Sequence, residues 1–248
     1  MTWNDMPKRW YDDYERGRPS YPRAAIDVAG LPPTATVVDL GAGTGKLTRL
    51  LVSTFSRVVA IEPDDEMRRL LVELCPKAES SGGSAEEIPL EDGSVDAVFA
   101  AQAFHWFDKD RGLAEFARVL RPRGTLVVMW NAQAGPPEPS IAAVERLLDR
   151  HWPEGWDPLD LGPSRYSRDI WRLVFAQSLF EDLQEARLAN PQTVDAEGLT
   201  AFLGSMGWIS AMPDDERIPL MERVRSLLTA TEYVLPWETH IYWTRLRQ

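Results

Sequence analysis

The sequence predicts an α/β protein with a doubly wound, mostly parallel sheet, and three observations predict it. From Thr36 to Asn131, short β-branched apolar runs alternate with patterns of helical spacing, which is the order of a parallel sheet covered by helices on both faces. A glycine-rich turn follows the first apolar run, and an acidic residue ends the second. Together these features predict a βαβ unit that binds a nucleoside-containing ligand.

The first strand is predicted over residues 36–40, where an apolar run contains one charge, Asp39. A carboxylate left charged and unpaired in a buried strand would cost several kcal/mol, so we expect Asp39 to have partners. Glycines in the turn that follows let a ligand approach the backbone closely just before a helix. The small residues of this turn are Gly41, Ala42, Gly43 and Gly45.

The second strand is predicted over residues 58–61 and ends at Glu62, which Pro63 biases toward an extended conformation. Glu62 follows Gly41 by about 20 residues, the interval that brings an acidic side chain to the ribose hydroxyls in a βαβ nucleotide site. Its carboxylate can accept two charge-assisted hydrogen bonds. The alternative is a solvated acid at the strand end, or a cap for the next helix.

The glycine spacing separates three ligand classes. The triphosphate-binding pattern G-x-x-x-x-G-K-[ST], aligned on Gly45 and Lys46, meets leucine at two required positions. The dinucleotide-binding pattern G-x-G-x-x-G requires a third glycine where Lys46 stands. Neither pattern fits, and what remains is D-x-G-x-G-x-G over residues 39–45.

This remaining pattern resembles the first motif of class I S-adenosylmethionine-dependent methyltransferases, and the resemblance continues in order along the chain. The block GSAEEIPLEDGSVDAVFAAQAFHWFD, residues 83–108, resembles the third and fourth strand regions of that family. RVLRPRGTLVVMWN, residues 118–131, resembles its helix, turn and fifth strand. Within the family the chain is methyltransferase type 11-like, and the phrases RPSYP and AFHWFD resemble the small-molecule branch that includes trans-aconitate methyltransferases.

The resemblance implies a Rossmann-like sheet of about seven strands with an antiparallel last strand, and S-adenosylmethionine as cofactor, with S-adenosylhomocysteine as product. Asp39 would help hold the methionine end of the cofactor, or would only brace the glycine loop. Ser84 stands where the family usually places an acid near the adenine, so a contact of its hydroxyl with the adenine would lack charge assistance. Glu86 would also lie near the adenine, the alternative being a plain surface acid. The implied cofactor-binding residues are Asp39, Gly41, Ala42, Gly43, Gly45, Glu62, Pro63, Ser84, Ala85, Glu86, Ala101 and Gln102.

Candidate acceptor-side residues follow the fourth strand, whose carboxyl end should open on the ligand crevice. His105 is a candidate general base or substrate-orienting donor, the alternative being a packed histidine. Trp106 either walls the substrate or fills the core. Tyr11, Tyr14 and Arg18 are candidates to close over the pocket, with Arg18 pairing with the methionine carboxylate or an anionic substrate; a solvated N-terminal arm is the equal alternative.

The rest of the chain is read as further helices and strands. Within the core we predict helices over 67–74 and 113–120, a turn at 121–124 and a strand at 125–131. A helix capped by Ser140 and a helical cap to about 175, with Trp152, Trp156 and Trp171, should follow. The last part is predicted to hold a core strand within 180–194, two helices within 195–229 and a closing strand within 232–246.

The predicted organisation is a single methyltransferase domain over 1–248. Aromatic residues among charges at the N-terminus, Trp3 included, indicate a short amphipathic lid, and a proline-rich break after Asn131 marks the end of the cofactor-binding core. The predicted parts are an N-terminal helical lid over 1–30, a cofactor-binding core over 31–131, a helical cap insertion over 132–178 and C-terminal core strands with a helical insertion over 179–248.

Composition limits the function classes. The chain has 248 residues and a net charge of −11, from 38 acidic and 27 basic residues, which argues against binding nucleic acid. No apolar run approaches the roughly 20 residues that span a bilayer, and the N-terminus is too charged for a signal peptide, so we expect a soluble, cytoplasmic protein without a membrane partner. The single cysteine, Cys75, predicts neither an internal disulfide nor a cysteine-based metal cluster, and we expect no metal.

The leading hypothesis is a methyltransferase (EC 2.1.1.-) that transfers a methyl group from S-adenosylmethionine to a small-molecule acceptor by in-line displacement. One alternative is a noncatalytic protein of the same fold that acts by binding or interaction, for which the ten tryptophans would supply a partner surface. A nicotinamide-dependent reductase is the third hypothesis, disfavoured by the missing third glycine. The sequence leaves the acceptor atom and the oligomeric state open.

Overall fold

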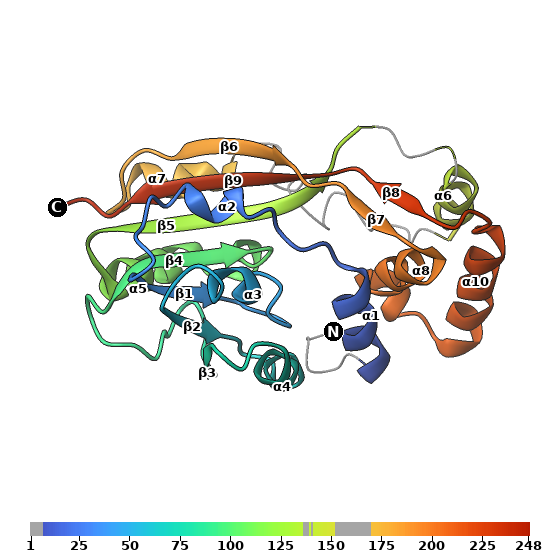
Figure 1. Cartoon of the computed structure of the whole chain (residues 1–248), viewed down its shortest axis with the longest axis horizontal. Helices are drawn as coiled ribbons and strands as arrows, with labels where there is room; N and C mark the ends of the chain where they lie inside the picture. Colours follow the sequence, from blue (N-terminus) through green and yellow to red (C-terminus); the bar gives the residue numbers. More distant parts are fainter. Residues whose placement is uncertain (1–6, 136–138, 140, 152–169) are drawn as a thin grey trace.

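A seven-stranded sheet with strand order β3-β2-β1-β4-β5-β9-β6 forms the centre of the molecule (Figure 1). The computed structural model describes residues 7–135, 139, 141–151 and 170–248. Strands β1 to β5 pair in parallel, whereas β9 runs antiparallel to both of its neighbours, β5 and β6. The predicted fold class is therefore confirmed, including the antiparallel last strand. The strands are β1 Thr36–Leu40, β2 Arg57–Ile61, β3 Glu79–Ser81, β4 Val95–Ala101, β5 Leu120–Gln133, β6 Gln184–Ala189 and β9 Trp237–Arg245.

Helices cover both faces of this sheet because successive strand residues point to opposite sides. Val37 and Phe99 pack with α2 and α3 on one face. Val38 and Val98 pack with α5 and α7 on the other. The strand order reverses at β1, which lies between β2 and β4, so the crevice at the carboxyl ends of β1 and β4 is where a ligand is expected. These helices are α2 Ala24–Asp27, α3 Thr48–Leu51, α5 Lys109–Val119 and α7 Leu173–Ala176.

A second hydrophobic core, separate from the sheet, is formed by α6, α8, α9 and α10 together with the two-stranded sheet of β7 and β8. Helix α1, Lys8–Gly17, packs against α8 at this end of the molecule (Figure 1). Trp171 and Phe175 belong to the core of the main sheet. The cap elements are α6 Ala142–Asp149, β7 Gln192–Val194, α8 Ala196–Gly204, α9 Gly207–Ser210, α10 Asp214–Leu227 and β8 Tyr233–Leu235.

The division of the chain at residues 31, 132 and 179 stays a prediction. Within the predicted cap insertion, β5 extends to Gln133, and the short helix η4, Ile170–Arg172, leads into α7. The predicted cap residue Ser140 and two predicted cap tryptophans, Trp152 and Trp156, lie outside the described residues, as does Trp3 of the predicted lid.

Two predictions in the first half of the chain were wrong in detail. The third strand was expected within residues 83–108, but β3 lies earlier, at Glu79–Ser81. It is a three-residue edge strand of Glu and Ser, without the apolar run that would mark it. Residues 121–124 were expected to form a turn, yet they belong to the start of β5. Arg123 has a positive φ of 63°, so this part of β5 departs from regular strand geometry.

The C-terminal half also differs from the prediction. The single strand expected within 180–194 is split between β6 in the main sheet and β7 in the small one, and the two helices expected within 195–229 are three. The single closing strand is likewise split into β8 and β9, with Pro236 between them. Proline cannot donate to a strand ladder, which accounts for a break at that residue.

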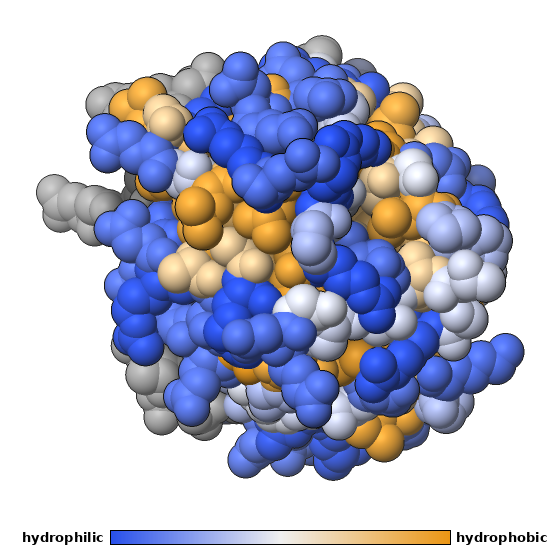
Figure 2. All heavy atoms as spheres, turned by 90° about the vertical axis from the view of Figure 1, so that its left-hand side faces the viewer, coloured by the Kyte–Doolittle hydropathy of each residue, from blue (hydrophilic) through white to orange (hydrophobic). Residues whose placement is uncertain are grey.

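The face at the opposite end from the cap, where the C-terminus lies, is mainly hydrophilic, with hydrophobic side chains in groups between hydrophilic ones (Figure 2). Within the described residues, no helix has the length and apolar character needed to cross a membrane.

Candidate functional site

Asp39 lies in β1 directly before the glycine turn and is 1% exposed. Its Oδ2 accepts a hydrogen bond of 2.5 Å from the hydroxyl of Thr48, the first residue of α3. Burial raises the pKa of Asp39 to about 7, since the Thr48 hydrogen bond only partly offsets the desolvation of the carboxylate. The expected partner thus exists, and the Asp39 carboxyl is poised to titrate near neutral pH.

The glycine turn adopts backbone conformations that favour glycine. Gly41, Gly43 and Gly45 all have positive φ, of 66°, 58° and 86°. A Cβ on Gly45 would lie 2.4 Å from Cys75 Sγ, which shows how closely α4, Asp65–Leu74, and the residue after it pack beneath the turn. At Gly43 the nearest atom to an added Cβ is the Met67 sulfur at 3.5 Å. The turn is therefore packed on the α4 side and less crowded at Gly43.

Glu62 holds the glycine turn in place through backbone N–H groups. Its Oε2 accepts from Gly43 N at 2.8 Å, and its Oε1 accepts from Asp64 N at 2.9 Å. The side chain is 7% exposed, and desolvation raises its pKa. It is thus neither a solvated strand-end acid nor the cap of α4, because Asp64 caps that helix through Met67 N. Each carboxylate oxygen retains acceptor capacity for a ligand hydroxyl. Pro63 beside it is exposed.

Ser84, Ala85 and Glu86 lie in the segment between β3 and β4. The Ser84 hydroxyl accepts from the backbone N–H of Glu86 at 3.2 Å, and Ala85 is buried in the sheet core. The Glu86 carboxylate accepts from Asp108 N at 2.8 Å. Glu86 is thus tied to Asp108, which precedes α5, while the Ser84 hydroxyl fixes the backbone of residues 84–86.

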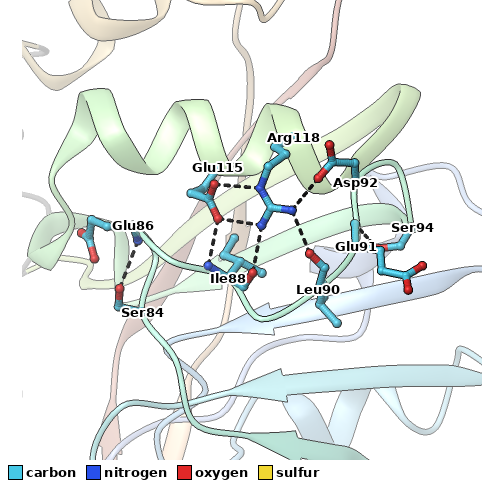
Figure 3. Close-up of polar contacts among 9 residues, drawn as sticks. All are labelled: Ser84, Glu86, Ile88, Leu90, Glu91, Asp92, Ser94, Glu115 and Arg118. Carbon is cyan, nitrogen blue, oxygen red and sulfur yellow. Dashed lines mark hydrogen bonds and ion pairs between the residues drawn. The ribbon is translucent and has the colours of Figure 1, made fainter.

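Arg118 of α5 braces this segment (Figure 3). Its guanidinium donates to both carboxylate oxygens of Glu115, to the carbonyl oxygens of Ile88 and Leu90, and to Asp92, with donor–acceptor distances between 2.7 and 2.9 Å. Glu115 also accepts from Ile88 N at 2.9 Å. Every guanidinium N–H therefore has an acceptor, and the segment that follows Ser84 is fixed to α5 at Ile88, Leu90 and Asp92.

We expect Arg118→Ala to lower the free energy of unfolding by about 1–2 kcal/mol, because it removes charge-assisted hydrogen bonds from a partly exposed site. A several-fold loss of S-adenosylhomocysteine affinity should accompany it if residues 84–86 contact a ligand. Urea denaturation and calorimetric titration measure the two effects. Arg57→Ala is the control, since it breaks an exposed pair with Glu79 and should change both quantities little. Equal behaviour of the two variants would contradict the bracing role.

The carboxyl end of β4 carries a strained residue. Gln102 has a φ of 54°, and its side-chain amide donates to the carbonyl oxygen of Asn131 at 3.0 Å. A non-glycine residue with positive φ persists only where its surroundings hold it, and such residues concentrate at functional sites. Ala101, which ends β4, is partly buried beside it. The structure therefore places Ala101 and Gln102 at the predicted crevice.

His105 and Trp106 lie in the short helix η2, Phe104–Trp106. The indole N–H of Trp130 donates to His105 Nδ1 at 3.3 Å. Indole nitrogen is only a donor, so the neutral imidazole carries its proton on Nε2. This arrangement favours the donor role of His105 over the general-base role. Trp106 is 58% exposed and does not fill the core.

Residues of α1 contact Asp64 after β2 and the glycine turn after β1. The Tyr11 hydroxyl donates to Asp64 at 3.3 Å, and burial and this carboxylate raise the pKa of Tyr11 to about 12. Glu15 contacts the glycine turn directly, because the Thr44 hydroxyl and the Arg49 guanidinium both donate to its carboxylate. Helix α1 is thus docked on the turn and is not a solvated arm.

Sequence reasoning missed Tyr21 and Asn131. Burial raises the pKa of Tyr21, and the charges of Tyr14 and Asp39 act in the same direction. Asn131 Nδ2 donates to Ser20 O at 3.0 Å, which ties the segment after α1 to the end of β5. Tyr21 belongs to the phrase RPSYP, which was a signal for it, whereas no local pattern marks Asn131.

The raised pKa of Asp39 predicts a pH effect whose sign is fixed. Its folded value of about 7 exceeds the reference value of 3.8, so between these pH values the folded chain holds a proton that the unfolded chain has lost. The free energy of unfolding contributed by this group therefore falls as the pH rises from about 4 to 7 and is constant above. A cationic ligand beside Asp39 should favour the carboxylate and release a proton.

Calorimetric titration with S-adenosylmethionine at pH 6.5, in two buffers of different ionisation enthalpy, measures this proton release. We expect Asp39→Asn to remove the buffer dependence. Buffer-independent heats for the unmodified chain would show that Asp39 does not face the ligand charge.

Comparisons with known proteins agree with this geometry. A family described as a methyltransferase domain matches residues 38–128. An uncharacterized methyltransferase of Mycobacterium tuberculosis is 40% identical over 218 residues, which are 87% of this chain and 82% of that protein. The malonyl-acyl-carrier-protein O-methyltransferase of Methylococcus capsulatus is 44% identical over 101 residues, 38% of this chain and 37% of that one. A solved structure of a proposed type II methyltransferase from Anaeromyxobacter dehalogenans shares the fold, with a TM-score of 0.69 at 24% identity, over 93% of this chain and 98% of that chain.

Proposed function

This chain belongs to the class I S-adenosylmethionine-dependent methyltransferases, and we propose that it transfers the methyl group of S-adenosylmethionine to a small-molecule acceptor by in-line displacement. The observation that carries the proposal is the pairing of Glu62 with Gly43 N at 2.8 Å. It places a two-oxygen acceptor beside a turn whose backbone a ligand can approach. We propose the cytoplasm as the location; membership of the trans-aconitate branch stays a prediction.

In this proposal the cofactor-binding residues divide by the part of the cofactor they contact. Glu62, with Pro63 after it, would hold the ribose hydroxyls, and Asp39 would hold the methionine end. The turn Gly41, Ala42, Gly43 and Gly45 would pass beneath the ligand. Ser84, Ala85 and Glu86 would lie near the adenine, and Ala101 and Gln102 beside the sulfonium. Acceptor capacity left on Glu62 and the absence of a close backbone neighbour at Gly43, where the nearest atom to an added Cβ is the Met67 sulfur at 3.5 Å, support this fit.

When bound, the cofactor supplies a methyl group already activated by the sulfonium, so this chain has only to orient the acceptor and exclude water. The tautomer set by Trp130 makes His105 Nε2 a donor. We propose that His105 orients the acceptor by this N–H, and that α1, whose Glu15 accepts from the hydroxyl of Thr44 in the glycine turn, closes the site with Tyr11 and Tyr14. An acceptor that is already an anion would need no base.

The test is to incubate the chain with S-adenosylmethionine carrying a ¹⁴C-labelled methyl group and a panel of carboxylic acids, alcohols, phenols and amines, together with malonyl-acyl-carrier protein. Label recovered in a small molecule would support the proposal. Label recovered only in the carrier protein would make the acceptor carrier-bound. Binding of S-adenosylhomocysteine without any methylated product across the panel would favour the noncatalytic alternative.

A further inference from the structure

Arg18 is held rigidly at the junction of the lid and the cap. It follows the last residue of α1. Its Nε donates to the Ser205 hydroxyl at 2.8 Å, and its Nη2 donates to the Ser205 carbonyl at 2.9 Å. The guanidinium carbon lies 5.6 Å from the centre of the Tyr14 ring and 5.4 Å from that of Phe202. One serine and two aromatic rings therefore fix the orientation of this cation.

The charge of Arg18 is not neutralised by any described acid. The groups whose charge acts on it are the phenols of Tyr14 and Tyr21, and burial lowers the pKa of its guanidinium. Within the described part of the chain, Ser205 supplies its hydrogen-bond acceptors, and both lie on Nε and Nη2. A partly buried cation without a counter-ion is unfavourable, and the guanidinium N–H groups that Ser205 does not engage suit a planar anion.

The position of Arg18 connects it to the acids of the site. Tyr14 is close enough to both Arg18 and Glu62 for their charges to act on its pKa in opposite directions. In the same way, Asp39 raises the pKa of Tyr21 and Arg18 lowers it. The contacts of α1 agree with this proximity: Tyr14, beside Arg18, packs in one cluster with Tyr11, whose hydroxyl donates to Asp64 just after β2. Arg18 therefore adds a cation to a crevice in which Asp39 and Glu62 supply carboxylates. Lys46 and Arg68, two other cations close to β1 and β2, already donate to the backbone carbonyls of Glu15 and Glu62.

We propose that Arg18 binds a carboxylate group of a ligand in this crevice, and that Ser205 of the cap is the positioning residue that holds it. The proposal rests on the proposed function for the identity of the crevice. The carboxylate belongs either to the amino-acid part of the cofactor or to the acceptor; the chemistry is the same. Because Ser205 directly follows α8, the ligand charge would be recognised only when lid and cap are in contact.

The experiment uses the full chain, with Arg18→Gln and Ser205→Ala as variants. Arg16→Gln is the matched control, since Arg16 lies on α1 but is exposed and pairs with Asp195 at 3.8 Å. Titrations use S-adenosylhomocysteine and 5′-methylthioadenosine, which shares the nucleoside and thioether but lacks the carboxylate. Succinate at constant ionic strength, read as a shift in melting temperature, probes an acceptor carboxylate.

If the carboxylate is that of the cofactor, Arg18→Gln weakens S-adenosylhomocysteine about tenfold or more, as expected for a lost charge-assisted pair, and leaves 5′-methylthioadenosine unchanged. If it is that of the acceptor, both nucleosides bind as before, and succinate stabilises the unmodified chain and Arg16→Gln but not Arg18→Gln. In either case Ser205→Ala gives a smaller change in the same direction.

Equal loss of both nucleosides in Arg18→Gln would overturn the proposal, because Arg18 would then only support the fold. No change with any of the three probes would overturn it as well. Should Arg18→Gln fail to fold, Arg18→Lys decides the matter: it keeps the charge without the fork, and we expect it to retain part of the carboxylate-dependent binding. If no nucleoside binds the unmodified chain, the proposed function fails, while the succinate arm still tests Arg18.

Discussion

Replacement of Glu62 by alanine is expected to weaken S-adenosylhomocysteine binding by about 1.5–3 kcal/mol, the loss for hydrogen bonds to a charged group. This corresponds to roughly a tenfold to hundredfold rise in Kd. The loss has two sources: the ribose acceptors disappear, and Gly43 N and Asp64 N lose the carboxylate that orients them. Calorimetric titration measures the effect.

Glu62→Gln sharpens this test. Its amide keeps one oxygen but turns an NH₂ group toward one of the two backbone N–H donors, so we expect a loss of affinity close to that of alanine. Glu79→Ala, at the exposed pair with Arg57 on the neighbouring strand, is the control and should bind normally. A Glu62→Ala variant with unchanged affinity would remove the carboxylate from the binding site.

Gly17→Ala, which adds a single methyl group, is expected to lower the free energy of unfolding strongly. Gly17 ends α1, and a Cβ there would lie 2.1 Å from Phe202 N and 2.3 Å from Phe202 Cα. These are backbone atoms of α8, so they cannot rotate away. Overpacking costs about 1–3 kcal/mol in ordinary cores and more where backbones collide. We expect a loss at the upper end or beyond, measured by urea denaturation.

The same change should weaken ligand binding, because it separates α1 from α8. Trp10 Nε1 and the Arg18 guanidinium both donate to Ser205, and these contacts depend on that approach. Gly82→Ala is the control, since the nearest atom to its added Cβ is the end of the Arg68 side chain at 3.4 Å. A Gly17→Ala variant as stable as Gly82→Ala would show that α1 does not dock as described.

The sequence predicted the fold where the signal is local. The β1 strand, the glycine turn and β2 were predicted because apolar β-branched runs and alternating glycines are contiguous in the chain. Strand β3 was misplaced because Glu79, Ser80 and Ser81 gain strand structure only from pairing with β2. The closing strand is split at Pro236 into β8, which pairs in the small sheet, and β9, which pairs in the main sheet. The sequence does not show that the two halves belong to different sheets.

The candidate site was predictable in residue identity more than in contacts. Three roles were weighed for Glu62, namely ribose acceptor, solvated acid and cap of the next helix, and the structure adds a fourth, the support of Gly43 N. The bond between Arg18 and Ser205 joins residues that lie 187 positions apart, and only tertiary packing brings them together. The positive φ of Gln102 likewise arises from its surroundings and has no mark in the sequence.

The central claim is that the carboxyl ends of β1 and β2 form an S-adenosylmethionine site, and titration of the full chain with S-adenosylhomocysteine and NADH, side by side, tests it most directly. We predict saturable binding of S-adenosylhomocysteine to one site per chain and no binding of NADH. Binding of NADH without binding of S-adenosylhomocysteine would contradict this claim and would show that the glycine turn binds a dinucleotide.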